Sequence, residues 1–123
     1  MPLKNKTRIL LISFALLFVS SQALPAKATI VLPSGRLKGR VTDSQSHKGI
    51  EGVTLELFWQ GFPYQKTKTD KNGNYSFASV DLCGQSSGLS LAAEKRGWSR
   101  TTEDNIAVPC WGTLEDNFSL ERV

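Results

Sequence analysis

The sequence predicts an all-β protein, a small antiparallel β-sandwich that follows an N-terminal signal peptide. Two observations predict the sandwich. Apolar and polar residues alternate in several short segments of the 123-residue chain, as they do in strands with one buried face. Polar, glycine-containing stretches separate these segments at spacings of roughly ten residues, which is typical of sandwiches. A sustained helical periodicity is not seen after the N-terminal segment.

Residues 1–28 have the layout of a secretory signal peptide. Basic residues precede an unbroken run of apolar or small residues from Ile9 to Val19, and small residues follow. Cleavage fits after Ala23 or Ala28, and we favour Ala28 because Pro25 complicates the first site. The alternative is a membrane anchor, but a helix of about 11 residues spans about 16 Å, whereas a membrane span needs about 20 residues. We therefore expect export to the periplasm or beyond, with no stable membrane span after cleavage.

The charge of the chain depends on the signal peptide. The formal net charge is +4, and the excess comes from four basic residues that precede Thr29, namely Lys4, Lys6, Arg8 and Lys27. From Thr29 onward the chain has 11 basic and 11 acidic residues. A mature protein with net charge near zero gives no electrostatic reason to expect a nucleic-acid partner.

The mature chain has two cysteines, Cys83 and Cys110. Roughly 95 residues form one domain with a modest core, and small exported domains often add a disulfide. We expect a Cys83–Cys110 disulfide. In the chain-entropy model, closing this loop stabilises the folded state by about 3–4 kcal/mol. Buried free thiols and metal ligation are the alternatives, although two cysteines without a partnered histidine give poor spacing for a metal.

The first half of the mature chain contains three expected strands. Residues 29–35 are interpreted as a leader, and the β-sandwich domain is expected to span residues 36–123. In residues 36–43, Leu37 and Val41 share one side. Residues 53–59 alternate strictly until Phe58. Residues 64–69 are polar and carry two lysines, which is typical of an edge strand.

The second half is less regular. Tyr75 and Phe77 lie on one face of the next expected strand, and Leu89 and Leu91 on one face of another. Residues 98–108 are expected to hold one irregular strand, and residues 117–120 to end the sheet with apolar residues on one face.

The segment TDKNGNYSF, residues 69–77, is consistent with a calcium loop or with a tight turn. Asp70 and Asn72 resemble the first ligands of a calcium loop, but Tyr75 stands where that loop requires glycine. The following strand also carries Asp81 too far away to close on the same ion. Asn72-Gly73 is the dipeptide of a type I′ hairpin, and Asp70 can accept backbone hydrogen bonds in a turn. We therefore expect a hairpin turn at Asp70, Asn72 and Gly73, with a looser calcium site as the alternative.

Three segments together resemble the carboxypeptidase regulatory-like domain: GRVTD (39–43), KGIEGVTLEL (48–57) and TKTDKNGNYSFASV (67–80). The matching positions are mainly turn glycines and core residues, and they cover a little under half of the mature chain. The resemblance implies a transthyretin-like, Greek-key-type sandwich of about seven strands. The chain departs from the family pattern after Val80, where VDLCGQSSGLSL brings in Cys83, and again at Cys110.

The sequence does not predict an enzyme, a metal site or a cofactor. His47 is the one histidine, and zinc carboxypeptidases need two histidines and a glutamate. Asp43, Ser46 and His47 are close in sequence, but a polar loop does not supply the scaffold or oxyanion hole of a triad. The hydroxyisourate hydrolases share the transthyretin fold, but they end in a Tyr-Arg-Gly-Ser-type tail, whereas this chain ends in FSLERV.

Four aromatic residues are candidate ligand contacts: Trp59, Phe62, Tyr64 and Trp98. Exposed aromatic side chains can stack on sugar rings or anchor a protein partner. The alternative is that they cover the core of a small sandwich. Trp111, beside Cys110, is expected to pack on the disulfide, as a tryptophan does in immunoglobulin domains.

The sequence thus predicts a binding or accessory module of the cell envelope, with a polysaccharide or an envelope protein as partner. A structural subunit that pairs through an edge strand is the alternative. Asn74-Tyr75-Ser76 and Asn117-Phe118-Ser119 are glycosylation sequons if the chain passes through a eukaryotic secretory path.

Overall fold

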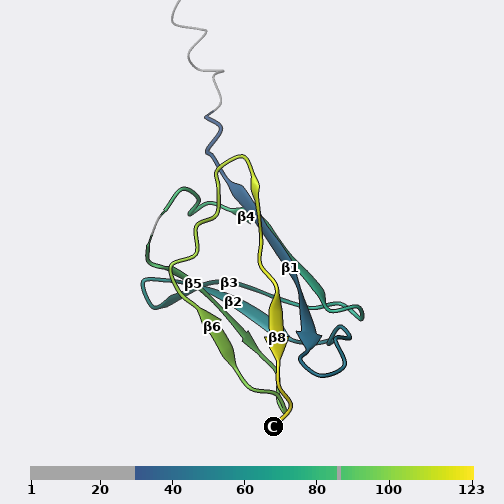
Figure 1. The fold of residues 1–123 in the computed structure, drawn as a ribbon. Helices are drawn as coiled ribbons and strands as arrows, with labels where there is room; N and C mark the ends of the chain where they lie inside the picture. The colour runs from purple at the N-terminus through teal and green to yellow at the C-terminus, as the bar shows by residue number, and fades with distance from the viewer. Residues whose placement is uncertain (1–29, 86) are drawn as a thin grey trace, which may run out of the picture. The chain divides into compact units, whose positions relative to one another are not determined.

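The computed structural model describes residues 30–85 and 87–123, which form an all-β sandwich of two sheets (Figure 1). The signal peptide expected at residues 1–28 and the first residue of the expected leader, Thr29, lie outside the described residues. The compact unit that contains the sandwich spans Leu32–Val123. Within the described residues there is no helix with the length and apolarity that crossing a membrane requires.

The first sheet is built around the long strand β1 (Gly35–Asp43). It pairs antiparallel with β4 (Asn74–Val80) and parallel with two short strands, β7 (Thr113–Glu115) and β8 (Phe118–Leu120). These two strands lie one after the other along the same edge of β1 (Figure 1). The predicted antiparallel sandwich is confirmed for the main strand pairs, and the two short parallel pairs at this edge are an addition to it.

The second sheet has the order β3-β2-β5-β6 and is antiparallel throughout. Its strands are β2 (Thr54–Trp59), β3 (Phe62–Lys68), β5 (Leu89–Glu94) and β6 (Thr101–Glu103). The lysine-bearing strand β3 is at one edge, as its polar pattern predicted. The other edge is the three-residue strand β6, where a longer irregular strand was expected in residues 98–108.

The described residues contain eight strands, one more than the family resemblance implies. The additional strand is β7, which has no apolar alternation because only Leu114 of its three residues is partly buried. The strand pairs with β1 and contributes a single side chain, Leu114, to the edge of the core. A sequence pattern based on alternation therefore has nothing to detect there.

The core lies between the sheets and consists of the apolar residues that alternate along the strands. Leu37, Val41, Val53, Leu55 and Leu57 are fully buried. The buried polar residue Thr69 is satisfied by hydrogen bonds, since its hydroxyl donates to the Ile50 carbonyl at 2.6 Å and accepts from the Val53 N–H at 2.9 Å. The core thus follows the alternation in the sequence, as expected for strands with one buried face.

The predicted turn at Asp70, Asn72 and Gly73 is present, but its type and its setting differ from the prediction. Asp70 Oδ1 accepts the N–H groups of Asn72 and Asn74, each at 2.9 Å. Only Gly73 has a positive φ, of 85°, so the type I′ prediction was wrong. The strands on either side belong to different sheets, since β3 pairs with β2 and β4 with β1. The turn therefore carries the chain from one sheet to the other.

The disulfide between Cys83 and Cys110 is confirmed, with an S–S distance of 2.03 Å. It joins the loop after β4 to the loop before β7. The Gly84 N–H donates to the Val108 carbonyl at 2.8 Å beside it, so the two loops are also held by their backbones.

Candidate binding surfaces

Two of the predicted ligand contacts, Trp59 and Phe62, face each other at the tip of the β2–β3 hairpin. The turn between them is Gln60-Gly61, with φ of 50° and 87°, the positive values at both positions that a type I′ turn requires. The Trp59 ring lies over Gly88, where an added β-carbon would come within 2.9 Å of it. Trp59 is partly buried against the core, and Phe62 is 73% exposed.

Tyr64 is tied to the neighbouring sheet. Its hydroxyl oxygen accepts the Asp81 N–H at 2.9 Å, and its ring packs against the core. Next to it, the Gln65 amide donates to the Ser79 carbonyl at 2.9 Å. These two side chains of β3 thus satisfy backbone groups at the end of β4, a structural role that accounts for Tyr64 without a ligand.

Trp98 lies at the other end of the second sheet. The register pairs Trp59 with Leu89 and Thr54 with Glu94, and these two ends of β2 are about 17 Å apart at 3.3 Å per residue. Arg122 lies 4.5 Å from the centroid of the Trp98 ring, a cation–π contact. The structure therefore does not bring the four aromatics into one shelf, and one face of Trp98 is already covered.

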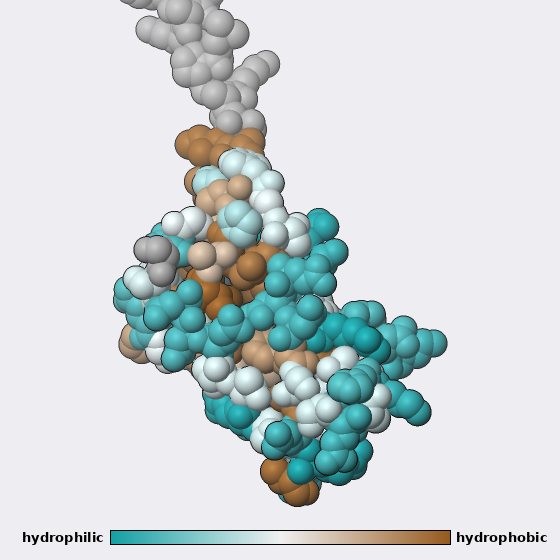
Figure 2. All heavy atoms as spheres, in the orientation of Figure 1, coloured by the Kyte–Doolittle hydropathy of each residue, from teal (hydrophilic) through white to brown (hydrophobic). Residues whose placement is uncertain are grey.

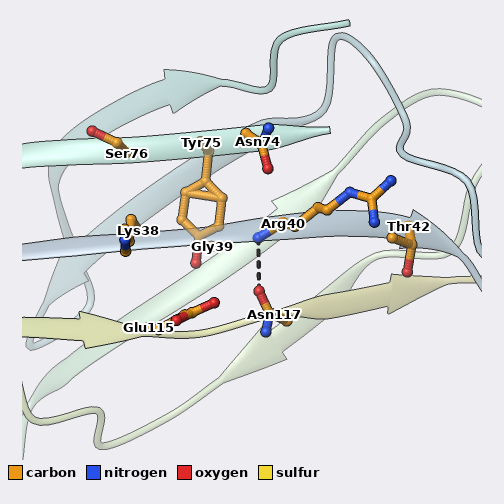
Figure 3. Close-up of a pocket in the computed structure, with 9 residues that line it drawn as sticks. All are labelled: Lys38, Gly39, Arg40, Thr42, Asn74, Tyr75, Ser76, Glu115 and Asn117. Carbon is orange, nitrogen blue, oxygen red and sulfur yellow. Dashed lines mark hydrogen bonds between the residues drawn. The ribbon is translucent and has the colours of Figure 1, made fainter. Parts of the chain in front are cut away.

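A polar surface lies on the outer face of the first sheet, where a hollow of about 610 Å³ is open to solvent. Figure 3 shows side chains of β1, β4 and the β7–β8 segment lining it. They are polar or charged, apart from Gly39 and the edge of Tyr75: Lys38, Arg40, Thr42, Asn74, Ser76, Glu115 and Asn117. The hollow contains two cations and one carboxylate.

Part of this hollow is held in place by hydrogen bonds. The Arg40 N–H donates to Asn117 Oδ1 at 2.9 Å (Figure 3), and Arg40 Nε donates to the Asn72 carbonyl at 3.0 Å. Lys38 and Ser76 are exposed and paired across β1 and β4. The face therefore combines an oriented guanidinium with exposed donors and acceptors.

Beneath this face lies a polar cluster that connects the sheets. The Tyr75 hydroxyl donates to the Asp116 carbonyl at 2.6 Å, and the Asp116 side chain has a buried oxygen without a protein partner. Burial, followed by the hydrogen bond to Glu103 and its charge, raises the pKa of Asp116 to about 7. Burial, with the neighbouring carboxylates, also raises the pKa of Tyr75. Gly39 is required here, because a β-carbon would collide with the Asp116 carbonyl.

Trp111 differs from the prediction that it packs on the disulfide. Its side chain is 69% exposed, and its φ is 63°, in the left-handed region. This exposure could not be predicted from the sequence, because the backbone conformation of a single loop residue leaves no periodic pattern.

The candidate sites described above all lie on the surface of the sandwich. His47 is exposed in the loop after β1. Within residues 30–85 and 87–123, no group of three or more His, Cys, Asp or Glu side chains is placed to hold a metal ion. In the view of Figure 2, hydrophilic residues cover most of the visible sandwich, and apolar residues show through in patches.

Comparison with known proteins assigns the fold. No protein-family model matches the chain, and no curated protein matches it in sequence. Among solved structures it is similar to a putative carbohydrate-binding protein from Bacteroides uniformis, with a TM-score of 0.56 and 15% identity over 72% of this chain and 41% of that one. The chain thus spans less than half the length of that neighbour.

Two further similarities widen the range of functions on this fold. Klebsiella pneumoniae 5-hydroxyisourate hydrolase has a TM-score of 0.53 and 19% identity over 72% of this chain and 91% of the enzyme. The full-length major pilin of Corynebacterium diphtheriae has a TM-score of 0.50 and 15% identity over 72% of this chain and 30% of the pilin. At these identities the likeness shows the fold alone: this chain is a transthyretin-like β-sandwich.

Proposed function

We propose that the chain is an exported, non-catalytic module of the carboxypeptidase regulatory-like type that binds carbohydrate of the cell envelope. The observation that carries this proposal is the solvent-open hollow on the outer face of the first sheet. Its hydroxyl, amide, ammonium and guanidinium groups can donate to and accept from sugar hydroxyls. The similar B. uniformis protein is described as a putative carbohydrate-binding protein, which supports the same class of ligand.

Export is part of the proposal. The predicted signal peptide and the Cys83–Cys110 disulfide both fit an oxidising compartment outside the cytoplasm. The mature chain has a net charge near zero. This fits a ligand that is recognised by hydrogen bonds and by a few local charges, because such a ligand does not need the strongly basic surface of a nucleic-acid-binding protein.

The edge-strand alternative, a structural subunit as in a pilus, has less support. The free edge of β4 is partly satisfied by Tyr64 and Gln65. The lysines on β3 disfavour pairing at that edge, and β6 offers three residues. An envelope protein therefore ranks behind a polysaccharide as the expected partner.

The test is isothermal titration of the purified protein with a panel of soluble neutral and acidic polysaccharides. The variant that probes the face is Lys38→Ala/Arg40→Ala. The matched control is Lys66→Ala/Lys68→Ala, which removes two exposed cations from the opposite sheet. We expect saturable binding to at least one polysaccharide, weakened about tenfold in the first variant, a typical loss for charged hydrogen bonds, and within about twofold of the parent in the second.

No binding across the panel would refute the proposal and favour a protein partner. Equal losses in both double variants would also count against it, because they would indicate non-specific charge attraction and not recognition by this face. Circular dichroism of each variant checks that the sandwich is retained.

A further inference from the structure

Trp111 combines two properties that a structural tryptophan does not have. The side chain is 69% exposed, so it contributes little to the core. Its backbone also adopts a φ of 63°, a conformation that is an outlier for a bulky residue and carries strain. Backbone strain that no gain in stability offsets is typical of residues held in place for function.

The loop around Trp111 is rigidly held. Cys110, the residue before it, is fixed by the disulfide to Cys83. The Trp111 N–H donates to the Ser34 carbonyl at 2.8 Å, and the Gly112 carbonyl accepts the Arg36 N–H at 2.9 Å. The exposed indole is thus presented from an anchored backbone, which lowers the entropy cost of binding a ligand.

A hollow of about 240 Å³ lies beside the indole. It is lined by Trp111, Arg36, Thr113 and Ala78, together with backbone of Ser34, Gly35 and Gly112. Arg36 is exposed. An aromatic face next to a guanidinium suits a sugar ring that carries a carboxylate, because the ring stacks on the indole and the carboxylate accepts hydrogen bonds from the arginine.

Both hollows lie along β1, since Arg36 lines the small one and Lys38 and Arg40 line the larger one. Arg36, Lys38 and Arg40 are alternate residues and therefore point to the same outer face, about 7 Å apart. Glu115 is the acidic residue among those that line the larger hollow, and the residues that line the small hollow include no acidic one. A row of three cations against one carboxylate complements an extended polymer with repeated negative charges.

We propose that Trp111 and Arg36 form a subsite for a uronic-acid residue, and that an acidic polysaccharide runs from this subsite along the Arg36–Lys38–Arg40 row. The proposal deepens the proposed function and rests on it. It adds the charge of the ligand, the aromatic contact and the direction of the chain on the sheet.

The test compares polygalacturonate with the same polymer after methyl esterification, which keeps the sugar backbone and removes the carboxylate charge. Poly-glutamate supplies carboxylates without sugar rings. We expect the purified protein to bind polygalacturonate at least about tenfold more tightly than either probe. Binding should weaken as salt rises.

Two variants probe the subsite. Trp111→Gly and Arg36→Ala should each weaken polygalacturonate binding about tenfold. Trp111→Gly should not lower the melting temperature, because glycine adopts a positive φ without strain and little buried surface is lost. Trp59→Ala is the matched aromatic control, expected to lower the melting temperature and to leave the affinity of the folded protein unchanged.

The outcomes separate the two proposals. Equal affinity for the charged and esterified polymers, or unchanged affinity in Trp111→Gly, overturns the uronate subsite and leaves carbohydrate binding standing. Equal affinity for poly-glutamate also overturns it, because charge alone then accounts for binding. Binding to none of the polysaccharides overturns both proposals.

Discussion

Trp98 and Trp111 show two opposite uses of the same residue type. Trp98 is half-buried, packs against the core and stacks with Arg122, and its backbone bridges to Arg122 near the C-terminus. Trp111 projects into solvent from a strained backbone next to the disulfide. Trp98 stabilises the fold, whereas Trp111 is held by the fold with its side chain in solvent.

Exposure alone therefore does not identify a binding residue. Phe62 is as exposed as Trp111, but it lies at the tip of a hairpin, where exposure has no conformational cost. Trp111 combines an exposed side chain, a strained backbone and an anchored loop. This combination distinguishes a side chain that the fold holds in solvent from one that lies on the surface by chance.

The largest expected effect is that of removing the brace under Trp111. The double substitution Cys83→Ser/Cys110→Ser should lower the free energy of unfolding by about 3 kcal/mol, because the unfolded chain regains the freedom of the closed loop. Denaturant unfolding measures this. If the loss is near zero, the backbone bonds alone hold the loop, and the disulfide is not what fixes Trp111.

The next effect concerns the tryptophan that we regard as structural. Trp98→Ala should lower the free energy of unfolding by about 2 kcal/mol, since a half-buried indole and a cation–π contact are lost. Thermal and denaturant unfolding provide the measurement, with Phe62→Ala as an exposed aromatic control expected to change little. A Trp98→Ala variant as stable as the parent would remove the distinction between the two tryptophans.

The last effect is a pH dependence of stability at Asp116, which lies between β7 and β8. Its pKa is raised from 3.8 to about 7, first by burial and then by Glu103. The folded state therefore binds the proton more tightly, so this contribution to stability is full below about pH 4 and is lost as pH rises through about 7. Asp116→Asn should flatten this decline, as measured by melting temperatures from pH 4 to pH 8. A slope that persists in the variant assigns it to another group.

Much of the fold was predictable because it depends on alternation. Leu37 and Val41, and likewise Leu55 and Leu57, lie on the buried faces that their spacing indicates. The turn at Asp70–Gly73 was predicted as a turn but not as a crossing between sheets, because a local motif does not specify which strands pair on either side of it. The I′ turn formed instead at Gln60-Gly61, where the β2–β3 register places it.

The candidate surfaces were less predictable. The sequence singled out aromatic residues near turns, and the structure covers one face of Trp98 and bonds the Tyr64 hydroxyl to Asp81. The alternation of Arg36, Lys38 and Arg40 is visible in the sequence. Their exposure is not, because it requires that no other element packs against that face of the sheet. Trp111 was misassigned, because burial of a loop side chain follows from tertiary contacts and not from its neighbours in sequence.

The β-sandwich and the Cys83–Cys110 disulfide could be predicted without the structure, because strand alternation, turn residues and cysteine count are local or compositional properties. Three further features depend on the tertiary structure: the parallel pairing of β7 and β8 with β1, the raised pKa of Asp116 and the exposure of Trp111. Each of these features depends on contacts between residues that are far apart in the chain, because hydrogen bonds and desolvation act only at short range. The order of residues along the chain does not say which distant residues come that close.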